Sequence, residues 1–300
     1  MAVDCEAVKN VSVISTGSAA MHREHMYGSR KPALWWVARG KEWVAAVPLN
    51  VFVIEHGEGL VLFDTGMNPS AATDPDYWTV GGDWADSVER WFLDRVFRFE
   101  IGPDDGLGPQ LGRAGYRPED VKAAVHSHLH FDHVGGIGDI PGAELFASPD
   151  AWDVVQKAKH PEREYIPRSR ILIPGARWQL LDFAPTDDPD LAPFTEACDV
   201  MGDGSLMVVS TPGHSFGSVS MLIRSAGSPP ILLVGDLTYS ADLLFDNELP
   251  GLGDKSALLE SFARVQAMKA NLPDLVVVAS HDTTAVSKLE AARRSVAAAT

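Results

Sequence analysis

The chain has 300 residues, of which 45% are hydrophobic and 22% are charged, a composition typical of a globular protein. Its 41 Asp and Glu residues outnumber its 25 Lys and Arg residues, which gives a formal net charge of −16 at pH 7. Nucleic acids and anionic membrane surfaces both bind proteins mainly through Lys and Arg. The charge balance therefore argues against a nucleic-acid partner and against a membrane partner.

The N-terminal sequence and the cysteines favour a cytoplasmic protein. The opening MAVDCEAVKNVSVISTGS lacks the basic region and apolar run of a secretory signal. The longest apolar runs, such as 275–279, are far shorter than the roughly 20 residues of a membrane span. Cys5 and Cys198 are far apart in sequence and have no neighbouring Cys or His cluster, so we expect idle thiols in a reducing compartment.

The first half of the chain predicts a mixture of strands and helices. Residues 51–66 form two β-rich runs around a Gly-Glu-Gly turn, which is typical of a hairpin. Residues 83–99 have apolar side chains at helical spacing and an acidic start, and therefore predict a helix. A short helical start at 117–120 precedes strands over 123–126 and 144–147, and a helix follows from Ser148 to about Lys159.

The second half repeats this alternation. Residues 160–200 are rich in Pro and Asp and predict a long surface excursion, either a plain loop, a lid or a contact between subunits. Beyond it we expect strands at 206–210, 219–224, 231–234 and 275–279, and helices at 255–271 and 285–299. Two rounds of hairpins and helices predict an α/β protein in which two sheets pack face to face with helices outside, an αβ/βα sandwich. We expect one domain over 1–300.

A dense group of histidines and one aspartate follows the strand at 123–126. The segment SHLHFDHVGG (127–136) places His128, His130, Asp132 and His133 within six residues. Imidazole and carboxylate at this density suit Zn, Mn, Fe or Co better than Ca or Mg. Side chains two apart in an extended loop point the same way, so the first two histidines can bind one ion. The next two residues lie on the following turn and can bind a second ion, and the paired glycines allow that turn to be tight.

Further ligands must come from elsewhere in the chain. His214, Asp236 and His281 each lie directly after a predicted strand, at 206–210, 231–234 and 275–279. Residues at the ends of several strands converge at one edge of a sheet, so we expect all seven side chains to meet. The remaining histidines are predicted not to bind metal; they are His22, His25, His56, His126 and His160.

These motifs resemble the metallo-β-lactamase superfamily over about residues 45–285. They are FDTG at 63–66, the HxHxDH segment, TPGHS at 211–215, GD at 235–236 and SHD at 280–282. The resemblance implies a four-layer αβ/βα sandwich with two facing mixed β-sheets and outer helices. It implies that His128, His130 and His214 bind one ion, that Asp132, His133 and His281 bind the second, and that Asp236 bridges both. It also implies that Asp64 braces the ligands from behind, although a turn-capping role is equally consistent with its position.

Other details narrow the branch of the superfamily. Its true β-lactamases carry a cysteine where Asp236 stands, and its flavin-diiron proteins carry a glutamate where His130 stands. Tyr239 lies three residues after Asp236, and this Asp-x-x-Tyr pattern resembles the N-acyl homoserine lactone lactonases, the quorum-quenching enzymes. One departure is GHSFGS at 213–218, where that family often has GHSPGH; the two differing positions, Phe216 and Ser218, are not ligand positions.

The lactonase resemblance implies a dinuclear metallohydrolase that opens a lactone ring by attack of a hydroxide bridging two divalent ions. Zinc is the first expectation, with Fe, Mn and Co as alternatives, and no organic cofactor is expected because no Gly-rich phosphate loop follows a strand. Tyr239 would donate a hydrogen bond to the carbonyl oxygen, and Asp132 would carry a proton to the leaving alkoxide. The alternative is a thioesterase or other carboxylic ester hydrolase, similar to glyoxalase II, on the same site.

The substrate's acyl chain would need an apolar wall. The N-terminal segment 1–45 is a candidate for the pocket or for a homodimer contact. Side chains that could supply the wall are Met21, Met26, Trp35, Trp36, Tyr77, Trp78 and Phe131. The sequence does not rank them, and it leaves the lactone, its chain length, the metal and the oligomeric state open.

Overall fold

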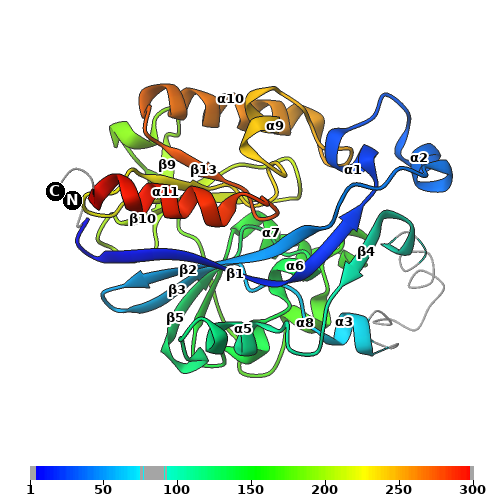
Figure 1. The fold of residues 1–300 in the computed structure, drawn as a ribbon, viewed down its shortest axis with the longest axis horizontal. Helices are drawn as coiled ribbons and strands as arrows, with labels where there is room; N and C mark the ends of the chain where they lie inside the picture. Colours follow the sequence, from blue (N-terminus) through cyan, green and yellow to red (C-terminus); the bar gives the residue numbers. More distant parts are fainter. Residues whose placement is uncertain (1–4, 75–76, 78–90, 92, 298–300) are drawn as a thin grey trace.

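The computed structural model describes residues 5–74, 77, 91 and 93–297 of the chain, without the side chains of 294–297. Two sheets run through this part of the chain (Figure 1). The first has seven strands in the order β4-β1-β2-β3-β5-β6-β7. Its strands are β1 (Val8–Met21), β2 (Val47–His56), β3 (Gly59–Phe63), β4 (Phe97–Glu100), β5 (Val121–Val125), β6 (Glu144–Ala147) and β7 (Arg177–Leu180).

The second sheet has six strands in the order β13-β12-β11-β10-β9-β8. Its strands are β8 (Ala184–Pro185), β9 (Glu196–Asp199), β10 (Leu206–Ser210), β11 (Val219–Ile223), β12 (Ile231–Leu233) and β13 (Val276–Val278). Both sheets are mixed, since β3, β5, β6 and β7 pair in parallel in the first and β12 pairs in parallel with β13 in the second. The remaining pairs are antiparallel.

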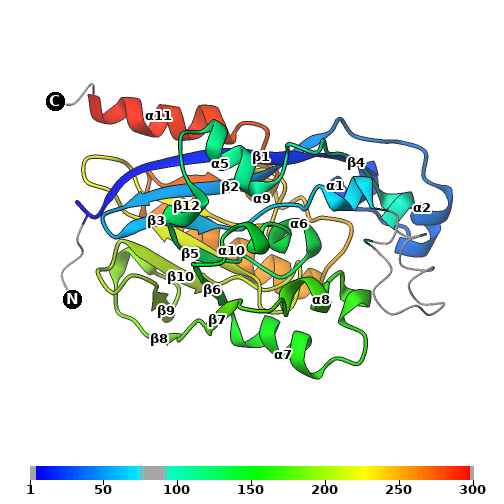
Figure 2. The ribbon, with the colours of Figure 1, turned by 90° about the horizontal axis from the view of Figure 1, so that it is seen from below.

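Helices cover the outer faces of both sheets (Figures 1 and 2). The longer ones are α2 (Ala33–Arg39), α5 (Leu107–Arg113), α7 (Pro149–Lys157), α10 (Lys255–Asn271) and α11 (Ala285–Ala297). Of these, α11 instead packs against β1 and β13 and closes one side of the core between the sheets. The shorter α-helices of the described residues are α1 (Arg23–Tyr27), α3 (Ser70–Thr73), α6 (Phe131–Val134), α8 (Arg168–Ile171) and α9 (Ala241–Phe245). Single 3-10 turns lie at Pro118–Asp120, Ile137–Asp139, Pro161–Glu164 and Pro189–Leu191.

Strand β2 shows why the molecule has four layers. Its residues Phe52 and Ile54 lie in the core between the sheets, together with Leu206 and Met221 of the second sheet. Its alternate residues Val51 and Val53 lie on the outer face, in a cluster that includes Leu107 and Leu111 of α5. Successive side chains of a strand point to opposite faces, so a strand that is apolar on both faces must be covered on both. The second sheet is covered in the same way by α10, and the predicted αβ/βα sandwich is confirmed.

Several element boundaries agree with the sequence, and three regions differ from it. The strands at 144–147 and 206–210 and the helix at 255–271 occupy the predicted residues. The helix predicted over 83–99 is wrong at its end, because 97–100 form β4; residues 91 and 93–96 are helical, and 83–90 and 92 lie outside the described residues. In β4, Phe97 and Phe99 are half-buried while Arg98 and Glu100 are exposed, a period of two that matches pairing with β1.

The second difference is β1, which the sequence analysis did not predict. Its 14 residues pair with β2 along their length and with β4 near their end. The third is the Pro- and Asp-rich segment 160–200, which is more ordered than a loop. It supplies β7 at the edge of the first sheet and β8 and β9 at the edge of the second, and so carries the chain from one sheet to the other.

Candidate metal centre

All seven predicted ligand positions follow the ends of strands at one edge of the sandwich. His128 and His130 lie in the loop after β5, and Asp132 and His133 lie on α6, which begins one residue later. His214 follows β10, Asp236 follows β12 and His281 follows β13. Strand-end positions that were distant in the sequence are therefore adjacent in the fold.

Close packing of the backbone, rather than a special turn, explains the glycines beside the ligands. Gly135 has an ordinary φ of −64°. A Cβ atom there would lie 2.3 Å from the backbone nitrogen of Asn68, so only glycine fits. Gly135 and Gly136 do lie in a turn, and their lack of a side chain is required there by the neighbouring backbone. Gly235 does have a positive φ of +56°, and its Cβ would lie 2.6 Å from that of Ser127.

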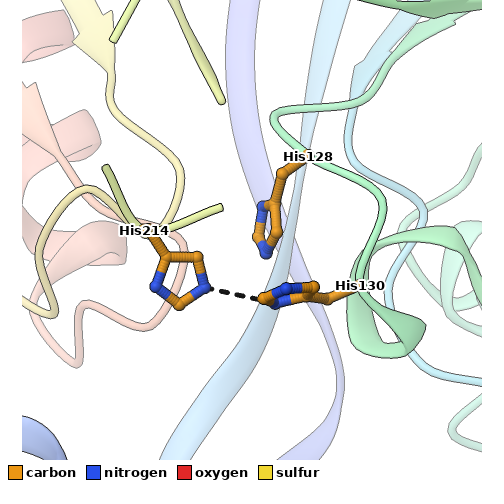
Figure 3. A group of neighbouring side chains, drawn as sticks. All are labelled: His128, His130 and His214. Atoms are coloured by element: carbon orange, nitrogen blue, oxygen red, sulfur yellow. Dashed lines mark hydrogen bonds between the residues drawn. The ribbon is translucent and has the colours of Figure 1, made fainter. Parts of the chain in front are cut away.

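Three imidazole rings, those of His128, His130 and His214, face one another (Figure 3). Their ring centroids are 4.3 to 4.9 Å apart, and Nε2 of His214 lies 3.2 Å from Nδ1 of His130. Burial, together with the neighbouring histidines, lowers the pKa of His128 and His130 well below the usual value. Neutral imidazoles that converge in this way are the form that a metal ion binds.

A second group consists of Asp132, His133 and His281, and Asp236 lies between the two groups. Its Oδ2 is 3.1 Å from Nε2 of His281 and 3.5 Å from Nε2 of His214. Its Oδ1 is 3.4 Å from Nε2 of His133. Burial alone would raise the pKa of Asp236, but His281 and His133 hold it well below the usual value. The carboxylate is therefore placed to contact ligands of both groups.

Hydrogen bonds behind the site hold three of the histidines through Nδ1, so that Nε2 of each faces the other side chains of the site. Nδ1 of His133 donates to Oδ2 of Asp64 at 2.8 Å, and Nδ1 of His281 donates to the carbonyl of Pro48 at 2.9 Å. The hydroxyl of Ser127 donates to Asp64, so Nδ1 of His128 must be the donor in its 3.0 Å contact with that hydroxyl. This arrangement is the one that usually orients metal-binding histidines.

Buried polar atoms without hydrogen-bond partners provide the test of whether a metal fits. Within the described part of the chain they include Nε2 of His128, Nε2 of His133 and Oδ1 of Asp236. A buried polar atom that is left unpaired costs roughly 1–3 kcal/mol. Several such atoms around one point, all of them nitrogen or carboxylate oxygen, fit divalent cations.

Asp64 is placed where it can brace the site. It follows β3, is completely buried, and has a positive φ of 66°. Besides His133, it accepts hydrogen bonds from the backbone and hydroxyl of Ser127 and from the hydroxyl of Ser280. Its carboxylate therefore connects the loops after β3, β5 and β13.

A cavity of about 1070 Å³ opens beside these side chains. His130, Asp132, His214, Asp236, Tyr239 and His281 line one part of it. Its apolar lining includes Met21, Leu49, Phe97, Phe99, Phe131 and Tyr165. The ring of Tyr239 stacks on that of His281, with centroids 5.7 Å apart.

The structure distinguishes among the apolar side chains that the sequence left unranked. Met21 and Phe131 line the cavity. Met26 and Trp36 are buried in other clusters, Tyr77 is buried, and Trp35 is 39% exposed; Trp78 lies outside the described residues. Phe97 and Phe99 were missed because they were assigned to a helix, whereas the alternation FRFE could have indicated a strand.

His25 is a further cavity residue that the sequence analysis left without a role. Its Nε2 lies 2.7 Å from the hydroxyl of Tyr239, 214 positions away in the chain. Nothing in the local sequence around either residue indicates this contact. The other histidines predicted not to bind metal lie outside both groups, and His126, for example, packs on Trp178.

Comparison with known proteins identifies the family to which the chain belongs. The family model of the metallo-β-lactamase superfamily matches residues 45–281. The chain belongs to that superfamily. A relative, the N-acyl homoserine lactonase AttM of Agrobacterium fabrum, is 32% identical over 247 residues, which cover 79% of this chain and 82% of that protein.

Two solved structures share the metallo-β-lactamase fold with this chain. One is an N-acyl homoserine lactone hydrolase with the product N-hexanoyl-L-homoserine bound at its catalytic metal center, with a TM-score of 0.70, 22% identity, and coverage of 94% of this chain and 95% of that one. The other is AidC, a dizinc quorum-quenching lactonase, with a TM-score of 0.62, 18% identity, and coverage of 94% and 93%.

Among the helices of the described residues, none combines the length and the apolar composition that a membrane span requires.

The buried histidines predict how the stability of the metal-free protein depends on pH. Burial lowers the pKa of five of them, to about 3 for His25, to about 4 for His126, and in the same direction for His128, His130 and His214. Below pH 6.5 the unfolded chain takes up protons at these positions and the folded chain does not. The free energy of unfolding should therefore fall from pH 6.5 to 5.5, by up to about 1 kcal/mol for each histidine.

His133 and His281 behave in the opposite way. Although burial lowers the pKa of each, Asp236 and the other nearby carboxylates raise it above the usual value. Their contribution is complete below pH 6.5 and is lost as the pH rises through the raised pKa, so stability should be greatest near pH 6.5. Urea unfolding of metal-free protein between pH 5.5 and 8 measures this. The variant His126→Phe, which lies outside the ligand groups, should lose less stability between pH 6.5 and 5.5, by the contribution of one histidine. A free energy of unfolding that does not change over this pH range in the wild type would contradict the prediction.

Proposed function

We propose that the protein is a dinuclear metallohydrolase that opens the ring of N-acyl homoserine lactones. The observation that carries the proposal is Asp236, which lies between two groups of ligand-type side chains beside a large apolar-walled cavity. AttM and one structural neighbour are named as hydrolases of these lactones, and the other neighbour, AidC, is named as a quorum-quenching lactonase with the product N-hexanoyl-L-homoserine; these names support the same substrate class.

The proposed ligands follow from the two groups and from Asp236 between them. His128, His130 and His214 would hold one divalent ion, Asp132, His133 and His281 the second, and Asp236 both. Zinc is the proposed metal, because nitrogen and carboxylate ligands suit it and because the neighbour AidC is a dizinc enzyme. When bound, the two ions would supply a Lewis acid for the ester carbonyl and would lower the pKa of water to near neutrality.

The chain's own residues would then orient the lactone and move protons. Burial, Asp236 and Asp132 raise the pKa of Tyr239 well above its usual value, so its hydroxyl keeps its proton and can donate to the carbonyl oxygen. Asp132 would accept the proton of the attacking water and return it to the alkoxide that leaves when the ring C–O bond breaks. The products balance as one hydroxy acid from one lactone and one water.

The apolar part of the cavity should favour lactones that carry an acyl chain. Each methylene that is buried on binding contributes about 0.8 kcal/mol. We therefore expect kcat/KM for N-hexanoyl homoserine lactone to exceed that for γ-butyrolactone, which has no acyl chain, by roughly a hundredfold. Proton release from zinc-loaded protein, followed with a pH indicator, measures both.

A His130→Ala/Asp132→Ala double variant provides the blank, since it lacks two of the proposed ligands. Ring opening that persists in the blank would show that the proposed site does not do the chemistry. If no lactone were opened although about two metal ions were bound per chain, the proposed lactonase function would be refuted. A glutathione thioester assayed in parallel tests the thioesterase alternative.

A further inference from the structure

The N-terminal segment 1–45 lines the cavity beside the proposed site with Ala19, Met21 and His25. His25, on α1, is 3% exposed and lines the cavity together with Tyr239 and His281. Its Nε2 lies 2.7 Å from the Tyr239 hydroxyl, a distance at which the two atoms share a hydrogen bond. The proposed function uses Tyr239 but gives His25 no role.

Packing around α1 fixes the position of the His25 ring. The ring meets Phe97 edge to face, with centroids 4.8 Å apart. The carbonyl of His25 accepts a hydrogen bond from the backbone of Gly251 at 2.8 Å. A Cβ at Gly251 would lie only 2.0 Å from the carbonyl oxygen of Glu24, so α1 and this loop are as close as two backbones can come. The ring is held against Tyr239 from two sides.

The surroundings of Nδ1 decide which nitrogen of His25 carries the proton. Burial lowers the pKa of His25 to about 3, and nearby metal cations would lower it further, so the ring is neutral and has one N–H. Nδ1 is buried and has no hydrogen-bond partner among the described residues. A buried N–H without a partner is rarer than a buried acceptor without one. The proton therefore belongs on Nε2, which faces Tyr239.

This tautomer determines what the Tyr239 hydroxyl can do. If Nε2 donates, the phenol oxygen accepts, and the hydrogen of Tyr239 is free to turn away from His25 into the cavity. With the opposite tautomer the phenol would donate to His25 and would have no hydrogen left for a substrate. A hydroxyl that accepts a hydrogen bond is also a stronger donor, because bonds in a chain polarise one another.

We propose that His25 is a positioning residue that holds the Tyr239 hydroxyl as a hydrogen-bond donor to the substrate carbonyl. This proposal rests on the proposed function, in which Tyr239 contacts the lactone. It gives the N-terminal segment a part in the reaction besides lining the cavity. His25 itself touches no reacting atom and acts only through Tyr239.

A double-mutant cycle on the zinc-loaded enzyme separates this role from a structural one. His25→Leu should lower kcat for lactone opening by about tenfold and change KM by less than about twofold. In a Tyr239→Phe background the same change should alter kcat by less than about twofold, because no hydroxyl remains to be positioned. An equal loss in both backgrounds would overturn the proposal.

A rescue variant and a control complete the kinetic test. His25→Gln places an amide N–H near the position of Nε2 and should restore kcat to within about threefold of the wild type. His160→Gln changes a histidine that does not line the cavity and should leave kcat unaltered. If the glutamine variant is as slow as the leucine variant while both bind zinc fully, the hydrogen bond is not the cause.

The tautomer can be measured without any turnover. Nitrogen-15 NMR of histidine-labelled, zinc-loaded protein distinguishes Nε2–H from Nδ1–H, and the His25 signals are those lost in His25→Gln. We expect Nε2–H, with signals that shift in Tyr239→Phe; Nδ1–H would overturn the proposal. If the wild type opened no lactone, the proposed function would fail, but these spectra would still decide how His25 and Tyr239 pair.

Discussion

Replacing Asp236 with alanine should reduce kcat/KM for lactone opening by about a thousandfold or more, which corresponds to roughly 4 kcal/mol. Asp236 faces His133, His214 and His281 at 3.1 to 3.5 Å. Without its carboxylate, the two proposed ions would lose their shared ligand and much of the negative charge that offsets their repulsion. The bound metal, measured by elemental analysis after dialysis, should fall below two ions per chain.

Two further variants separate charge from shape. Asp236→Asn keeps the size of the side chain and removes only the charge, so we expect it to lose nearly as much activity as alanine. Asp242→Ala removes an exposed aspartate six positions further on and should leave activity and metal content unchanged. Full metal content together with full activity in Asp236→Ala would show that the carboxylate holds neither ion.

The proposed metal-binding motif was recognisable because its chemistry is local. His128, His130, Asp132 and His133 fall within one short segment, and no packing argument is needed to see that they can converge. Three further candidate ligands could be predicted because each follows an apolar run that is typical of a strand; they are His214, Asp236 and His281. Likewise, the helix at 255–271 has a capping aspartate, Asp254, whose side chain accepts from two backbone N–H groups of its first turn.

What the sequence did not indicate depends on contacts between distant segments. Strand β1 contains Ser, Thr, Gly and Ala, a weak apolar pattern, and it is stabilised by its pairing with β2 and β4 rather than by local preference. The apolar spacing around 91–99 fits a helix until β1 provides a partner for Phe97 and Phe99. The contact between His25 and Tyr239 likewise exists only once α1 has packed beside the loop at Gly251.

We propose that Asp64 supports the metal site through hydrogen bonds rather than by binding an ion. Asp64→Ala should lower the free energy of unfolding by about 3–5 kcal/mol, the cost of removing one partner from a buried, hydrogen-bonded charge pair. Four donors would be left without this acceptor: His133 Nδ1, the backbone and hydroxyl of Ser127, and the Ser280 hydroxyl. Because His133 would no longer be oriented, zinc affinity should fall by roughly 10- to 100-fold. Urea unfolding and competition with a zinc chelator measure the two effects.

The backbone of Asp64 allows the cause of this loss to be identified. Its φ of 66° is in the left-handed region, which glycine adopts freely and asparagine adopts more readily than alanine. Asp64→Gly removes the same carboxylate as alanine without the strain, so it should be more stable than Asp64→Ala by about 1 kcal/mol. Asp64→Asn keeps one acceptor oxygen but turns an amide N–H₂ toward the donors around it, and should lose zinc affinity nearly as strongly. If Asp64→Gly were as stable as the wild type, Asp64 would serve only the turn after β3, and the hydrogen bonds to Ser127, Ser280 and His133 would not be what stabilises the site.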